Sequence, residues 1–235
     1  NQILDRIVDR STGFTRQVIN AGRIDNSGIE VALNGTPVKT KDFKWKTFMT
    51  FSTNKNKIVS MANNDTTIIL RSSAVGGGQI VAKVGGSLGD MYGTGFERSP
   101  DGEVIYDANS GLALLSNTPV YLGNTIPKYK ASIGSEFNFK QFRLNVLFDG
   151  QQGAVAHSYT HGRLADFGKL TATLPGRYSG IVGHGVVRNG DGTFSPNTKI
   201  TTDITSFYNY TMGTANGEGA TYKTDFIKFR EARLD

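Results

Sequence analysis

The chain has 235 residues, 37 % of them hydrophobic, with 29 glycines, 14 phenylalanines and nine tyrosines. This composition is typical of an ordered chain rich in strands and turns, and it excludes intrinsic disorder. The net charge is +6, but the basic residues are scattered, which disfavours nucleic-acid binding. The absence of cysteine excludes disulfides and thiolate metal sites.

The first strands are predicted after a polar N-terminal stretch, residues 1–27, that indicates no clear element. Their apolar residues alternate with polar ones and are Ile29, Val31 and Leu33 in one strand and Phe43, Trp45, Met49 and Phe51 in the next. All are odd-numbered, so one shared face requires a loop of odd length, either 40–42 or 38–42. Pro37 is expected near the strand end, where its missing N–H is tolerated, and Phe48 breaks the alternation.

The middle of the chain gives weaker patterns. Residues 54–57 indicate a polar continuation of the strand or a turn. Glycine clusters between 75 and 96 predict bends and close backbone approaches instead of one regular strand.

Residues 129–150 predict a hairpin with a fixed register. Apolar residues alternate from Tyr129 to Phe139, and their parity switches after Lys140-Gln141. A two-residue loop there puts all of them on one face, and the predicted pairs are Phe139 with Phe142, Phe137 with Leu144, Ile133 with Phe148, Asn138 with Arg143, Glu136 with Asn145 and Ser132 with Asp149. Each arm has the length of about ten residues that a tilted strand needs to cross a bilayer, and aromatic residues gather at the turn.

Residues 150–220 show no clean periodicity and hold all three histidines. We interpret them as large loops with short strands, the usual location of binding residues. The candidates for stacking on sugars or bonding polar ligands are Tyr159, His161, Arg177, Tyr178 and Tyr208. Ordinary loop packing remains an equal alternative for each. The last segment, 221–235, is strand-like but alternates poorly.

No metal site, cofactor or catalytic centre is predicted. His157 and His161 have the spacing of metal ligands on a helix, but no amphipathic helix is indicated and the intervening Glu of zinc proteases is missing. Asn189 to Gly192 and Asp101-Gly102 favour tight turns over calcium loops, because neither completes the ligand pattern. No serine lies in a glycine elbow, so the chain is not expected to be an enzyme.

A set of short motifs, in this order, resembles the barrel of SusC/RagA-type TonB-dependent outer-membrane transporters. The motifs lie at 19–24, 28–34, Trp45, 51–56, 84–89, 92–93, 101–102, 106–107, 121–124, 127–129, 160–161, 174–177 and 226–231. The resemblance implies an all-β fold, an antiparallel meander forming part of a large transmembrane β-barrel of the plugged, 22-stranded class. Residues 1–235 would form one partial barrel domain of about eight to ten strands, with long extracellular loops within 150–220. The plug domain and the last strands are expected outside this chain.

The same resemblance implies the import of glycans or peptides across the outer membrane of a Gram-negative bacterium of the Bacteroidetes type. The implied partners are a SusD-like surface lipoprotein, TonB acting through the plug domain, and outer-membrane lipid. Strand alternation alone also fits a soluble secreted β-rich carbohydrate-binding or adhesion domain. No apolar run approaches the ~18 residues of a membrane helix, so a membrane role would depend on strands. The two hypotheses therefore differ in what covers the apolar strand faces, which is lipid in the first and a protein core in the second.

Overall fold

The computed structural model describes residues 2–62, 65–73 and 77–235. Its largest element is a six-stranded antiparallel sheet, the wall sheet, which confirms the predicted all-β antiparallel fold. In spatial order its strands are β1 (Gln2–Ile7), β2 (Arg16–Lys39), β3 (Phe43–Met61), β9 (Tyr129–Phe139), β10 (Phe142–Gln152) and β17 (Phe226–Leu234). The wall holds fewer strands than the eight to ten expected, because two long insertions use the remaining residues.

The predicted hairpin register is confirmed. Phe139 pairs with Phe142, Phe137 with Leu144 and Ile133 with Phe148, and the three polar pairs also lie opposite one another. The turn is Lys140-Gln141, and Lys140 has a φ of 53°, the left-handed conformation that tight hairpin turns require. The apolar and polar residues of β9 and β10 therefore occupy opposite faces of the wall sheet.

The β2–β3 connection matches the shorter predicted loop, residues 40–42. A register shift between Gly35 and Val38 adds one residue to β2. Leu33 pairs with Met49 before this bulge and Val38 pairs with Trp45 after it, so the bulge keeps apolar residues of both parities on one face. Pro37 lies inside the bulge, where its missing N–H costs no ladder bond. Residues 54–57 continue β3.

A β-bulge also explains the poor alternation of the last segment, residues 221–235. Leu147 pairs with Glu231 and Phe148 with Phe229, so Arg230 is an extra residue in β17. This bulge shifts the parity of the strand. Leu234 and Phe229 therefore share the apolar face although one is even-numbered and the other odd-numbered.

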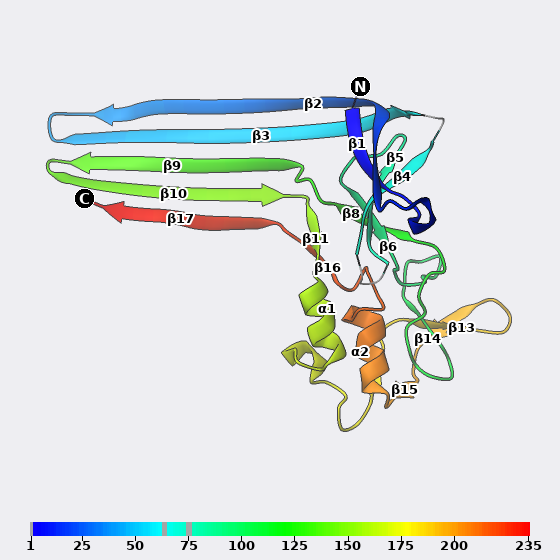
Figure 1. Cartoon of the computed structure of the whole chain (residues 1–235). Coiled ribbons are helices and arrows are strands. Elements are labelled where there is room, and N and C mark those ends of the chain that lie inside the picture. Colours follow the sequence, from blue (N-terminus) through cyan, green and yellow to red (C-terminus); the bar gives the residue numbers. More distant parts are fainter. Residues whose placement is uncertain (1, 63–64, 74–76) are drawn as a thin grey trace.

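Two insertions leave the wall at the end opposite its short turns, and we call them together the outer lobe (Figure 1). The first, residues 62–128, joins β3 to β9, and the second, 153–225, joins β10 to β17. The first contains β4 (Thr67–Ser72), β5 (Gln79–Lys83), β6 (Asp90–Gly93), β7 (Ile105–Tyr106) and β8 (Val120–Asn124). The second contains β11 (Val155–His157), α1 (Tyr159–Asp166), β12 (Ile181–Val182), β13 (Val186–Arg188), β14 (Phe194–Pro196), β15 (Ile200–Thr201), α2 (Ile204–Met212) and β16 (Thr221–Lys223).

The described residues also form the 3₁₀ turns η1 (Arg10–Thr12) and η3 (Thr171–Thr173). Of the glycine-rich stretch 75–96, residues 75 and 76 lie outside the described part, and the rest forms β5, β6 and the bends around them. Asn189 to Gly192 forms the turn between β13 and β14, with Asp191 accepting a hydrogen bond from the Thr193 amide at 2.9 Å.

The two helices contradict the expectation that 150–220 contains none. Ser158 caps α1 by accepting from the His161 amide at 3.1 Å, and Asp203 caps α2 by accepting from the Ser206 amide at 3.0 Å. They have eight and nine residues, too few for a readable periodicity, and such short helices depend on packing for stability. Within the described ranges, no helix has both the length and the apolar character needed to cross a membrane.

Two hydrophobic clusters hold the outer lobe. Ile58 of β3 packs with Ile68 and Ala82, which joins the wall to β4 and β5. Tyr106 of the first insertion packs with Phe207 of α2 in the second. The cores therefore lie in the outer lobe and at its junction with the wall.

Candidate functional site

The wall sheet leaves its apolar face uncovered. Side chains from five neighbouring strands are exposed there, with exposed fractions of 63 % for Ile29, 39 % for Met49, 51 % for Ile133, 41 % for Phe148 and 58 % for Phe229. In water a contiguous apolar surface of this kind is unfavourable. The outer face of a membrane-spanning sheet carries such residues, because lipid is itself apolar.

Aromatic residues border this face at both ends. Near the short turns, Phe43, Phe139 and Phe142 are direct neighbours across three strands, and the Trp45 ring stacks on Phe137 with centroids 5.9 Å apart. At the other end Phe51 stacks on Tyr129 at 5.9 Å. Between the two rows Phe148 packs on Phe229 at 5.0 Å, level with Ile133. The sequence predicted the first row, and the structure adds the second.

The separation of the two rows matches the apolar band of a membrane barrel. Strand β9 has 11 residues and carries one row at each end. At about 3.4 Å per residue its ends lie about 34 Å apart along the strand. A tilt of about 40° reduces this to roughly 26 Å in height, close to the band of ~25 Å in outer-membrane barrels.

The opposite face carries polar side chains that bond across strands. Lys46 Nζ lies 2.8 Å from Glu136 Oε1, and the Thr50 and Ser132 hydroxyls share a hydrogen bond. Arg230 donates to both carboxylate oxygens of Asp149. These pairs are half-exposed to exposed, as side chains in a water-filled interior would be.

Phe48 is the aromatic exception on the polar face. Its ring covers Gly134 on β9, where an added Cβ would lie 2.3 Å from two ring carbons. Gly134 is buried as a result. The broken alternation in the sequence thus corresponds to an aromatic ring that needs a glycine beside it.

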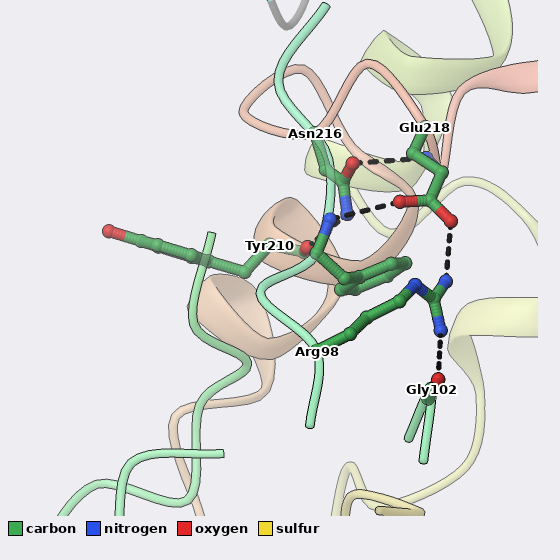
Figure 2. Close-up of polar contacts among 7 residues, drawn as sticks. Arg98, Gly102, Tyr210, Asn216 and Glu218 are labelled. Atoms are coloured by element: carbon green, nitrogen blue, oxygen red, sulfur yellow. Dashed lines mark hydrogen bonds and ion pairs between the residues drawn. The ribbon is translucent and has the colours of Figure 1, made fainter. Parts of the chain in front are cut away.

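The outer lobe is tied together by a polar network around Glu218, shown in Figure 2. Glu218 accepts from the Phe96 amide at 3.0 Å and pairs with Arg98 at 2.5 Å. Arg98 also donates to the Gly102 carbonyl at 2.9 Å, and the fully buried Asn216 donates to the Tyr210 carbonyl at 2.9 Å. The two bonds of Glu218 join the first insertion to the segment that follows α2.

Asp166 forms a second junction at the end of α1. Its carboxylate accepts from the Thr214 amide at 3.0 Å, the Thr214 hydroxyl at 2.6 Å and Asn209 Nδ2 at 2.7 Å. Burial raises the pKa of Asp166, but these hydrogen bonds and the nearby Arg163 outweigh it, so the pKa lies below the ordinary aspartate value. The carboxylate therefore stays ionised and holds α1 against α2.

Two of the predicted binding residues lie together at the start of α1. Tyr159 is 53 % exposed. His161 packs edge-on against Tyr222 of β16, and the Tyr222 hydroxyl lies 2.5 Å from His161 Nδ1. Burial raises the pKa of the Tyr222 phenol. The sequence did not single out Tyr222, because nothing local marks a residue that meets its partner only in the folded chain.

The other three candidates have different surroundings. Tyr178 is fully exposed. Arg177 donates to the carbonyls of Thr173 at 2.9 Å and Gly168 at 2.6 Å, so much of its guanidinium supports the local loop. Tyr208 is 4 % exposed and donates to the Pro175 carbonyl at 2.9 Å. Its ring belongs to the core between α2 and the first insertion, which removes it from the surface expected for it.

The two histidines with metal-ligand spacing do not share a helix. His157 lies on β11, with its Nδ1 3.1 Å from the Thr221 hydroxyl, and His161 lies on α1. Across the described residues, no three His, Asp or Glu side chains converge on a point that would hold a metal ion.

Together, a strand meander with one uncovered apolar face, two aromatic borders and a polar opposite face defines part of the wall of a transmembrane β-barrel. No protein-family profile matches the chain. The chain is 28 % identical over 192 residues to TonB-dependent receptor P26 of Formosa agariphila, covering 72 % of this chain and 19 % of that protein. It is 23 % identical over 180 residues to TonB-dependent receptor P3 of the same organism, covering 67 % and 18 %.

Two solved structures share the fold. The RagAB peptide transporter matches 70 % of this chain and 19 % of its own with a TM-score of 0.56. The RagAB peptide importer in its closed-closed state matches 99 % and 25 % with a TM-score of 0.62, and both are 14 % identical to this chain. The chain spans about a fifth of the length of the curated relatives it matches. These similarities support the resemblance to SusC/RagA-type TonB-dependent receptors that the sequence indicates.

Proposed function

We propose that residues 1–235 form one partial barrel domain of an outer-membrane TonB-dependent importer. The wall sheet contributes strands to the barrel, with its apolar face toward lipid and its polar face toward the lumen. The outer lobe, including the loops within 150–220, faces the outside of the cell. The observation that carries this proposal is the uncovered apolar face between two aromatic rows.

The cargo is a glycan or a peptide that contacts the outer lobe. Tyr159, His161, Arg177 and Tyr178 are the substrate-facing residues in this proposal, whereas Tyr208 supports them from the core. A SusD-like surface lipoprotein shares recognition, and TonB acts through a plug domain outside this chain. The solved relatives named as peptide transporters support the peptide alternative, and the location is the outer membrane of a Gram-negative bacterium.

The alternative of a soluble secreted β-rich binding domain requires the apolar face to pack inside a core. The described outer lobe lies at the end of the wall and leaves Ile133 and Phe229 exposed. This arrangement favours the membrane proposal.

The experiment places a charge on each face at one depth in the full-length receptor. Ile133→Lys puts a cation on the apolar face, between the two aromatic rows, which costs about 2 to 4 kcal/mol near the bilayer midplane. Ser132→Lys is the matched control, because Ser132 lies on the polar face near Asp149. We expect Ile133→Lys to reduce the folded receptor in outer-membrane fractions severalfold and Ser132→Lys to leave it unchanged.

Uptake of labelled oligopeptides and oligosaccharides by whole cells gives the functional readout. Deleting the receptor gene or TonB should abolish uptake of the cargo class. Equal membrane levels of both lysine variants, or uptake that persists without TonB, would contradict the proposal.

A further inference from the structure

A pocket of about 480 Å³ lies where the two insertions meet above the wall. Its sides come from the ends of β4 and β5 in the first insertion and from β11 and the start of α1 in the second. Gln151 of β10 lies at its base and donates to the Thr224 carbonyl at 3.1 Å. Gln151 has the parity of Asp149 in β10, so the pocket adjoins the outer end of the polar face.

The described lining of the pocket contains a basic side chain but no acidic one. The side chain of Arg71 is exposed in it, and its guanidinium makes no hydrogen bond or ion pair with any residue that the structure describes. No aspartate or glutamate is among the described lining residues. An arginine without a counter-ion beside neutral walls gives a positive potential and a planar fork of donors that matches a carboxylate.

The remaining lining suits the part of a ligand next to that carboxylate. Ile80 and Met91 give an apolar wall, and the half-exposed ring of Tyr159 stands at the start of α1. Aromatic and apolar surfaces beside a few polar groups are the usual composition of a small-ligand site, and the volume falls in the usual range.

We propose that this pocket binds a carboxylate group of the imported ligand, with Arg71 as its ion-pair partner and Tyr159 packing against the adjacent residue or sugar ring. The inference rests on the proposed function and specifies an acidic end or acidic unit as the recognised feature. A free peptide C-terminus and a uronic acid both present this chemistry.

The test measures binding to the purified full-length receptor in detergent with four probes. The peptide arm compares trialanine with trialanine amide, and the sugar arm compares trigalacturonate with its methyl ester. We expect the free acid to bind at least tenfold more tightly than its neutral form in one arm. That arm identifies the source of the carboxylate.

Arg71→Gln should bring the acid and neutral affinities within about twofold of each other. Arg10→Gln is the control, because Arg10 lies in an exposed turn outside this pocket and its loss changes the net charge equally. Retention of the acid preference in Arg71→Gln, or no acid preference in either arm, would overturn the proposal. If neither arm shows an acid preference but TonB-dependent uptake persists, the proposed import function is retained and the carboxylate site is rejected.

Discussion

Single residues hold the elements of the outer lobe together. Asp166 is the clearest case, because four donors from Arg163, Asn209 and Thr214 converge on one carboxylate at the end of α1. Such hydrogen bonds to a charged acceptor are stronger than neutral ones, and leaving their donors unsatisfied is costly. The contribution of this side chain to stability therefore depends on its charge.

Asp166→Asn should destabilise the α1–α2 junction by about 1 to 3 kcal/mol. In the native protein the same stabilisation is present above the ordinary aspartate pKa of 3.8 and is lost as pH falls through the lower pKa of the folded state. Hydrogen exchange at residues 209–220, corrected for intrinsic rates, measures both effects.

The control for this prediction is Asp191→Asn, since Asp191 bonds Thr193 in a distant exposed turn. It should leave exchange at 209–220 unchanged. If Asp166→Asn kept the pH dependence of the native protein, another acid would be responsible for it.

At the scale of elements, β-bulges decide which face each strand presents. The sequence placed Pro37 near a strand end and showed poor alternation over 221–235, and the structure finds one extra residue in the strand at both places. A bulge shifts parity without ending the ladder. A search for strict period-two alternation therefore misses strands that contain a bulge, although their apolar residues still lie on one face of the sheet.

Contact between the adjacent strands β3 and β9 also explains why residue 134 is a glycine. Gly134→Ala should destabilise the wall by about 1 to 3 kcal/mol, because its Cβ would overlap the Phe48 ring. In a Phe48→Ala background the same change should be nearly neutral. Urea unfolding of the full-length receptor in detergent, followed by gel mobility without heating, gives the four free energies of the cycle.

Gly35→Ala serves as the control in the same sheet, because a Cβ there has no atom within 4 Å. It should change stability by less than about 0.5 kcal/mol. Additive effects of the Gly134 and Phe48 substitutions would show that the ring moves freely and that the glycine has another role.

At the scale of the whole molecule, two insertions far apart in sequence form one outer lobe. The Glu218 to Arg98 pair and the Phe207 to Tyr106 contact both cross between them. Because the pocket beside Arg71 is lined by both insertions, the geometry of any binding site there depends on this joining.

Glu218→Gln should loosen the joint, because the amide cannot accept from both the Phe96 amide and Arg98. The pair is partly exposed, so we expect a loss of about 1 kcal/mol. Hydrogen exchange should rise at 94–98 and 216–220 while β9 and β10 remain protected. Glu103→Gln, at an exposed position in the same insertion, should change neither segment.

The sequence by itself determined the β9–β10 hairpin, its turn, its register and its two faces. These follow from local alternation, since a two-residue loop leaves one pairing that puts every apolar residue on one side. An odd-length β2–β3 loop, either 40–42 or 38–42, and the aromatic residues near the short turns were also readable, because each turn and its flanking aromatic residues are close in sequence.

Only the tertiary structure decided the outer lobe. Its helices are too short to show a period, and Tyr208 is buried by residues of the other insertion. Arg71 of β4 and Tyr159 of α1 line one pocket although they lie in different insertions. Such contacts join residues far apart in sequence, so they form only when the loops close and the segments pack together. The wall is therefore encoded in neighbouring residues, and the candidate site arises from the meeting of distant ones.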